Sequence, residues 1–126
     1  MKQHVLAVGI ATAVAFGTGA AWAEGDAAAG EKAFNTCKAC HKIDKGAGNG
    51  IGPNLHGVVG RKAGTAEGFQ YSTAMKDSGI TWDEANLDAY LTDPKAKVPG
   101  NKMAFAGVKN DKQRQDIIAY LKKESE

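Results

Sequence analysis

Apolar side chains recur at helical spacing near the C-terminal end of the chain. Ile117, Tyr120 and Leu121 follow the i, i+3, i+4 spacing of an amphipathic helix with one buried face. Asn110 and Asp111, directly upstream, are both residue types that cap a helix N-terminus. The pattern therefore predicts a final helix that begins at Asn110 or Asp111.

A second amphipathic helix is predicted in the middle of the chain, where Leu87, Tyr90 and Leu91 would form the buried face. The segment Thr81-Trp82-Asp83-Glu84 has the spacing of a capping box, which predicts Thr81 as the N-cap. Asp93-Pro94 should end this helix, because the residue before a proline is driven away from the helical conformation.

The first helix of the folded protein is expected from Asp26 to Ala39, with Asp26 as its N-cap. Gly30, Phe34 and Cys37 would share one face of it. Glycine lowers helix propensity by about 1 kcal/mol relative to alanine. Gly30 therefore indicates that the backbone of another helix approaches closely at this position.

The rest of the chain shows no strand-like alternation of useful length. A short turn of helix is predicted near 72–76, and the eight glycines between 46 and 68 favour an Ω-like wrapping loop. Together these patterns predict a small all-α domain whose helices are joined by irregular segments.

The N-terminal segment has the features of a secretory signal peptide. Lys2 precedes an apolar run from Val5 to Ala20, and Ala21-Trp22-Ala23 is an A-x-A cleavage site. An uncleaved membrane anchor is the alternative, but the run is close to the lower length limit and lacks a basic stop-transfer flank. We expect a cleaved signal at 1–23 and one folded domain at 24–126.

The charge balance argues against one class of partner. The chain has 16 Lys and Arg and 14 Asp and Glu, a formal net charge of +2. Removal of Lys2 with the leader would bring the mature chain still closer to neutrality. Net charge therefore gives no support to nucleic-acid binding.

Both cysteines of the chain lie in one short motif, Cys37-Lys38-Ala39-Cys40-His41. C-x-x-C-H is the attachment signature of haem c, in which two thiols form thioethers with the porphyrin and the histidine binds the iron. A redox dithiol would need a βαβ context, zinc would need a second Cys/His pair, and a structural disulfide would leave His41 without a role. We therefore predict one covalent haem, attached at Cys37 and Cys40, with His41 as an axial iron ligand.

The second axial ligand determines what the haem can do. Met103, Met75 and His56 are the candidates in the mature chain. Met103 lies in an irregular Pro- and Gly-bounded segment that could arch over the far face of the ring, although it could also fill a gap in the core. Met75 ends a short helical turn and is expected to pack, and His56 is expected at the surface. We therefore favour Met103 as the second ligand. His/Met ligation would close both axial positions, which suits electron transfer rather than catalysis.

Many short motifs of this chain match a known family of proteins in their order and spacing. They are Gly30 and Phe34, Cys37 to His41, Gly52-Pro53-Asn54-Leu55, Gly60-Arg61-Lys62, Gly68-Phe69-Gln70-Tyr71, Gly79-Ile80-Thr81-Trp82, Tyr90-Leu91, Pro94, Pro99 to Met103 and Phe105, and Tyr120-Leu121. With these motifs the chain resembles the class I cytochromes c, in the branch of mitochondrial cytochrome c and bacterial cytochromes c2. The resemblance covers nearly all of 25–121 and implies that the N- and C-terminal helices cross and that loops wrap around the haem.

The resemblance also implies roles for further residues. The Pro53 carbonyl would accept a hydrogen bond from Nδ1 of His41, and Tyr90 would lie near the sulfur of Met103. The other haem-pocket residues would be Tyr71, Trp82, Arg61 and Asn101 beside the haem propionates, and Phe105 over the exposed haem edge.

Charged residues are unevenly placed along the chain. The segment 32–62 has six basic residues and one acidic residue, 95–109 has four lysines and no acidic residue, and 77–93 has five acidic residues and no basic one. Both basic segments flank predicted iron ligands. They are therefore expected to meet around the haem edge and to steer docking onto acidic surfaces of redox proteins.

We therefore predict a soluble, monomeric, periplasmic electron carrier and not an enzyme. It would shuttle electrons from a cytochrome bc1-type donor to an oxidase, a reductase or a photosynthetic reaction centre. A haem enzyme or gas sensor would need an open iron, which carbon monoxide binding to the reduced protein would reveal. A thiol–disulfide oxidoreductase would have cysteines that react with iodoacetamide.

Overall fold

The computed structural model describes residues 24–126 together with Gly9. Apart from Gly9, the predicted signal peptide at 1–23 lies outside the described residues. The helices are α1 (Ala27–Ala33), the 3-10 helix η1 (Phe34–Ala39), α2 (Thr73–Lys76), α3 (Glu84–Thr92), α4 (Pro94–Lys97) and α5 (Asp111–Lys123). Within 24–126 there is no strand beyond an isolated bridge between Lys62 and Thr81, so the predicted all-α class is confirmed. No helix in this range has the length and apolarity needed to cross a membrane.

The first helical segment begins where its cap predicts. The Asp26 carboxylate accepts hydrogen bonds from the backbone N–H groups of Ala28 and Ala29, at 2.9 and 3.4 Å, and so satisfies two donors of the first turn. The predicted extent to Ala39 is correct, but from Phe34 onward the segment is 3-10 rather than α-helical. A 3-10 turn at the end of an α-helix is common, and here it contains Cys37 and is followed directly by Cys40.

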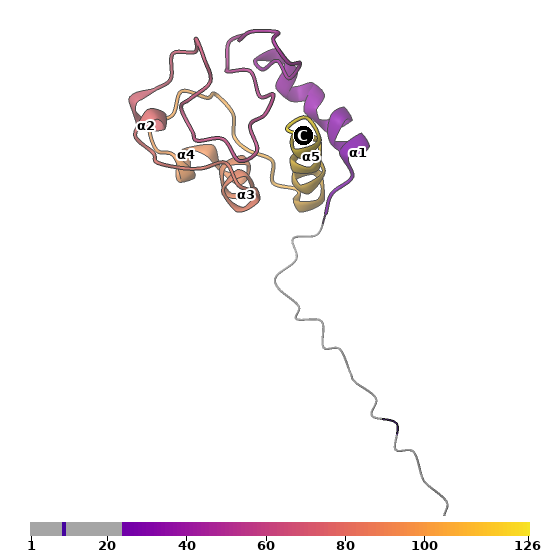
Figure 1. The fold of residues 1–126 in the computed structure, drawn as a ribbon. Coiled ribbons are helices and arrows are strands. Elements are labelled where there is room, and N and C mark those ends of the chain that lie inside the picture. Colours follow the sequence, from indigo (N-terminus) through magenta and orange to yellow (C-terminus); the bar gives the residue numbers. More distant parts are fainter. Residues whose placement is uncertain (1–8, 10–23) are drawn as a thin grey trace, which may run out of the picture.

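Helices α1 and α5 lie side by side (Figure 1), and they cross at Gly30. A Cβ atom at this glycine would lie only 1.8 Å from the carbonyl oxygen of Asp116 in α5. The ring centroids of Phe34 and Tyr120 are 5.3 Å apart at the same interface. The close approach predicted from Gly30 is therefore confirmed. Helix α5 begins after Asn110, whose side chain accepts from the Gln113 N–H at 2.9 Å.

The N-cap predicted for the middle helix is wrong by two residues. Asp83, not Thr81, caps α3, and its carboxylate accepts from the Asn86 N–H at 2.7 Å. Thr81 instead lies in the isolated bridge to Lys62, which commits its backbone to an extended pairing and leaves the helix to start later. The Thr81 carbonyl accepts a bond from the Asn86 side chain, so this residue still supports the turn from outside the helix.

One helix was not expected from the sequence. Asp93 ends α3 as predicted, with extended backbone angles, but its carboxylate also accepts from the Ala96 N–H at 3.2 Å. Pro94 then stands in the first turn of α4, where its missing N–H is no disadvantage. The Asp-Pro pair therefore ends one helix and begins the next.

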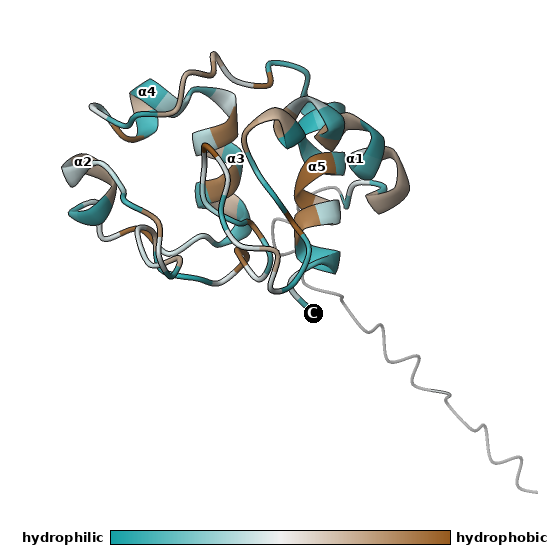
Figure 2. Ribbon diagram, turned by 90° about the horizontal axis from the view of Figure 1, so that it is seen from above, coloured by the Kyte–Doolittle hydropathy of each residue, from teal (hydrophilic) through white to brown (hydrophobic). Residues whose placement is uncertain are grey.

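The long segment between η1 and α2 contains no helix, as the eight glycines predicted. It wraps around a core formed by residues from all parts of the described chain. Helices α3 and α5 show both apolar and polar stretches, as expected for helices with one buried face (Figure 2). Buried apolar residues of this core include Phe34, Met75, Trp82, Leu87, Tyr90, Ile117, Tyr120 and Leu121.

Candidate haem-binding site

The two cysteines lie one turn apart, Cys37 within η1 and Cys40 directly after its end. The backbone N–H groups of Cys40 and His41 both donate to the carbonyl oxygen of Cys37, at 3.1 and 2.9 Å, which closes the motif into a tight turn. Both thiols are free; Cys37 is partly buried and Cys40 is exposed. Burial, with a smaller contribution from the neighbouring Cys40 thiol, raises the pKa of Cys37. The turn therefore presents two thiols and an imidazole from one short stretch of chain.

His41 is held in one tautomer by the loop that follows the motif. Its Nδ1 lies 2.8 Å from the carbonyl oxygen of Pro53. A carbonyl oxygen can only accept, so Nδ1 carries the proton and Nε2 keeps a lone pair available for a metal. Burial lowers the pKa of His41, although the bond to Pro53 opposes this, so the neutral form that binds metals is favoured.

Gly52 allows this loop to lie against the imidazole. A Cβ atom at Gly52 would be 2.5 Å from Cε1 of His41, so any side chain here would displace the ring. The Gly52 N–H also donates to the Cys40 carbonyl at 2.8 Å, which ties the loop to the cysteine motif. The glycine makes a close-fitting cradle for the histidine.

Met103 lies on a segment that is fixed by a neighbouring amide. The Met103 N–H donates to Oδ1 of Asn101 at 2.9 Å, and Nδ2 of Asn101 donates to the carbonyl oxygens of Pro94 and Val98, both at 2.9 Å. Both amide protons of Asn101 therefore bind the backbone, and this residue clamps the segment to α4. Its implied bond to a haem propionate has no support from these contacts.

The hydroxyl of Tyr90 lies 3.9 Å from Sδ of Met103 and donates to it. Burial raises the pKa of Tyr90 to about 12, so the hydroxyl keeps its proton over the physiological range. The Tyr90 ring packs against Trp82, with 4.9 Å between centroids and 52° between the planes. Tyr90 therefore joins the thioether to the buried aromatic core.

The remaining residues of the expected haem pocket have mixed surroundings. The Tyr71 hydroxyl accepts from the Ala66 N–H at 2.9 Å, and it still has its own proton to donate. Cys37, Tyr71, Met103 and Phe105 pack against one apolar cluster, which contains Trp82 and Tyr90. Segments that are distant in the sequence thus border the same core.

Arg61 and His56 both belong to the loop that follows the cysteine motif. Nη1 and Nη2 of Arg61 donate to the carbonyl oxygens of His56 and Asn54, at 3.1 and 3.2 Å, so the guanidinium braces the loop next to Pro53. The prediction that His56 lies at the surface is wrong: the residue is partly buried, and its Nδ1 is buried with no hydrogen-bond partner. Met75 is buried in the core, as expected for a packing residue.

These donor groups fit a covalent haem. Two free thiols are suited to thioether bonds, a neutral imidazole and a thioether are both iron ligands, and the surrounding core is apolar and aromatic. Sequence reasoning missed the cradle at Gly52 and the clamp formed by Asn101. The only local signal for the cradle was a glycine next to a proline shortly after the motif. The Asn101 clamp had no local signal, because it depends on the fold bringing α4 close to Asn101.

Comparison with known proteins agrees with this site. The family model for cytochrome c matches residues 27–125. The chain is 59% identical over 97 residues to cytochrome c2 of Rhodoblastus acidophilus, covering 77% of this chain and 91% of that protein. It is 55% identical over 96 residues to cytochrome c2 of Rhodoplanes tepidamans, covering 76% of this chain and 90% of that protein. The solved structure of cytochrome cH from Methylobacterium extorquens has 59% identity and a TM-score of 0.75, and the match covers 79% of this chain and 99% of that chain.

The chain therefore belongs to the cytochrome c family. Its relatives confirm the predicted assignment to the class I cytochromes of the c2 branch. It is an electron carrier rather than an enzyme, and its C-x-x-C-H motif carries one covalent haem c at Cys37 and Cys40.

Proposed function

We propose that this cytochrome is a soluble, periplasmic one-electron carrier whose haem iron is bound axially by His41 and Met103. The observation that carries the proposal is the fixation of Met103, whose N–H is bound by Asn101 and whose sulfur accepts from the Tyr90 hydroxyl. The bond from Nδ1 of His41 to Pro53 supports the opposite ligand, because it leaves Nε2 unprotonated.

The haem would supply a one-electron iron couple. The protein would close the coordination positions of the iron and insulate the haem. His41 and Met103 would together leave no coordination position of the iron for a substrate. Tyr71 and Trp82 would partner the haem propionates, because buried carboxylates need hydrogen-bond donors. Phe105 would cover the haem edge, and Arg61 would hold the Pro53 loop in place.

The ligation is tested by the visible spectrum of the oxidised protein. We expect a weak sulfur-to-iron band in the far red, which should be lost in Met103→Ala and kept in the control variants Met75→Leu and His56→Gln. Reduced wild-type protein should bind carbon monoxide slowly and incompletely at neutral pH. Unchanged optical and redox properties in Met103→Ala would refute the proposed ligand pair.

The proposed partners are redox proteins with acidic docking surfaces. Lysines are concentrated in 32–62 and 95–109, the two segments that flank the proposed iron ligands. A positive surface of this kind accelerates encounter with acidic partners and weakens as salt screens the charges. The donor would be of the cytochrome bc1 type, and the acceptor would be an oxidase, a reductase or a photosynthetic reaction centre. The carrier would act as a monomer with short-lived contacts.

Two measurements test these assignments. Electron-transfer rates with a purified bc1-type complex should fall as ionic strength rises, and Lys95→Gln should reduce that dependence more than Lys123→Gln near the end of α5. Salt-independent rates would contradict electrostatic docking. The mass of protein recovered from a periplasmic extract should match residues 24–126 plus one haem, and retention of 1–23 would contradict cleavage after Ala23.

A further inference from the structure

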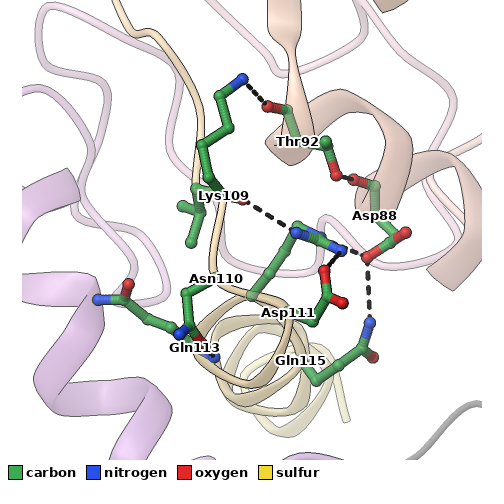
Figure 3. Close-up of polar contacts among 9 residues, drawn as sticks. Asp88, Thr92, Lys109, Asn110, Asp111, Gln113 and Gln115 are labelled. Carbon is green, nitrogen blue, oxygen red and sulfur yellow. Dashed lines mark hydrogen bonds and ion pairs between the residues drawn. The ribbon is translucent and has the colours of Figure 1, made fainter.

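The segment that follows Met103 is fastened to the C-terminal end of α3. The Val108 N–H donates to the Leu91 carbonyl at 2.7 Å, and Nζ of Lys109 donates to the Thr92 carbonyl at 2.6 Å (Figure 3). Gly107 makes this contact possible, because a Cβ atom there would lie 2.2 Å from the Thr92 carbonyl oxygen. Its φ of +110° is also one that other residues rarely adopt.

Arg114 of α5 adds a charged cross-link at the same point. It is only 6% exposed, and its three donor groups bind three different parts of the chain. Nε donates to the carboxylate of Asp88 in α3, Nη1 donates to the Val108 carbonyl at 3.0 Å, and Nη2 donates to the carboxylate of Asp111 at 2.7 Å. The guanidinium therefore connects α3, the Met103 segment and the first turn of α5.

The two carboxylate partners of Arg114 differ in how easily water could replace the guanidinium as their hydrogen-bond donor. The Asp111 side chain is 90% exposed, whereas that of Asp88 is 18% exposed. Asp88 also accepts from the Gln115 side chain at 3.0 Å, and its own carbonyl accepts from the Thr92 hydroxyl. Removing the guanidinium would leave the Val108 carbonyl and the Asp88 carboxylate short of a donor in a partly buried place, which is costly.

We propose that Arg114 is a positioning residue for Met103, acting by fixing Val108 at the C-terminal end of the segment that carries the thioether. The inference rests on the proposed ligation of the iron by Met103. The other end of the segment is already fixed by Asn101, which binds the carbonyls of Pro94 and Val98. Only a few residues separate the two anchors, Asn101 and Val108. Added motion at Val108 would therefore also move the sulfur of Met103.

Imidazole binding to the oxidised holoprotein measures this effect directly. Imidazole can bind the iron only in molecules in which the thioether has moved away, so its apparent affinity follows the population of that state. We expect the dissociation constant for imidazole to fall about tenfold in Arg114→Lys, which keeps the charge but loses the fork, and severalfold in Asp88→Asn. The Val108 amide should exchange with deuterium faster by a similar factor, relative to the Ile118 amide in α5.

Two control variants separate positioning from general stability. Gln115→Met removes another α5 bond to the same Asp88 oxygen but none to the Met103 segment. Asp116→Asn weakens the contact of α5 with the start of α1, away from that segment. Both controls should lower the global stability while leaving the imidazole affinity within about twofold of wild type.

Each outcome is decisive for one of the two proposals. An imidazole affinity that rises as much in Asp116→Asn as in Arg114→Lys would show a general loss of stability and overturn the inference. Unchanged affinity in both Arg114→Lys and Asp88→Asn, with the far-red band present in the wild type, would also overturn it. If Arg114→Lys does not yield folded holoprotein, the comparison of Asp88→Asn with the controls decides alone. Absence of the far-red band from the wild type would instead refute ligation by Met103.

Discussion

The crossing of α1 and α5 at Gly30 makes a quantitative prediction possible. In Gly30→Ala the new Cβ atom would start 1.8 Å from the Asp116 carbonyl oxygen and 2.9 Å from Cβ of Tyr120. Ordinary contact distances begin near 3.4 Å. The helices would therefore have to separate by more than about 1 Å, because backbone atoms on both sides cannot turn away as a flexible side chain could.

The expected loss follows from what this interface buries. Phe34, Ile117 and Tyr120 are 1%, 3% and 5% exposed, so a separation of this size disturbs close packing around all three. Overpacking a core costs about 1–3 kcal/mol, and a disturbed aromatic pair adds about 1 kcal/mol. The alanine regains up to about 1 kcal/mol of helix propensity. We expect a net loss of about 2 kcal/mol, which lowers Tm by about 8–16 °C for a domain of this size.

Denaturant and thermal unfolding of the oxidised holoprotein, followed by far-ultraviolet circular dichroism, measure this loss. The matched control is Ala28→Gly, an exposed position of α1 that does not face α5. The control lowers helix propensity by at most about 1 kcal/mol, whereas Gly30→Ala raises it. If Gly30→Ala is as stable as the wild type, or more stable than Ala28→Gly, the crossing is not held by close backbone approach and the reasoning fails.

Three further predictions test the cofactor, an acidic anchor and the tyrosine beside the thioether. The double variant Cys37→Ser/Cys40→Ser should lose covalent haem in the pyridine adduct assay and fold poorly, because so small a domain buries little apolar surface without the ring; a native helical spectrum would contradict this. A hydrogen bond from the Asp26 N–H, and secondarily Lys112, lowers the pKa of Asp116. The ionised Asp116 therefore stabilises the fold fully above the ordinary carboxyl pKa of about 3.9, and this stabilisation is lost as pH falls through the lower pKa that Asp116 has in the folded protein. The difference in unfolding free energy between wild type and Asp116→Asn should therefore be constant near neutral pH and shrink below about pH 4; a pH-independent difference would contradict the pairing. Tyr90→Phe should lower the reduction potential by less than about 60 mV in voltammetry, because the hydroxyl withdraws electron density from Sδ, and an unchanged or higher potential would exclude that bond.

The sequence was sufficient for features that depend on neighbouring residues. The caps at Asp26 and Asn110 follow from side chains that bind N–H groups two or three positions away, and the structure has both. The extent of the first helical segment was also correct, but its change to 3-10 geometry at Phe34 was not foreseen. The covalent haem followed from a motif whose spacing is set by the chemistry of attachment.

The errors occurred where a distant segment competes with a local pattern. Thr81 fits a capping box, but its bridge to Lys62 takes the backbone out of the helix, so Asp83 becomes the cap. Pro94 was correctly expected to end α3, yet the same residue starts α4 because Asp93 can cap it. The bonds from Asn101 to the carbonyls of Pro94 and Val98 were not foreseen, because the sequence had not revealed α4; the contact of Asn101 with a propionate stays a prediction.

The segments that bear the proposed iron ligands are held in a different way from the helices. His41 is bound to the Pro53 carbonyl, Asn101 to the carbonyls of Pro94 and Val98, and Arg114 to the carbonyl of Val108, so each loop is fixed by a side chain that reaches a backbone oxygen. The contact of α1 with α5 instead depends on close packing around Gly30. Ligand geometry and global stability should therefore respond to different substitutions. Gly30→Ala should lower the unfolding free energy and leave the far-red band in place up to the unfolding transition. In Arg114→Lys, by contrast, Met103 should dissociate and the far-red band should weaken at denaturant concentrations at which the helices are still intact.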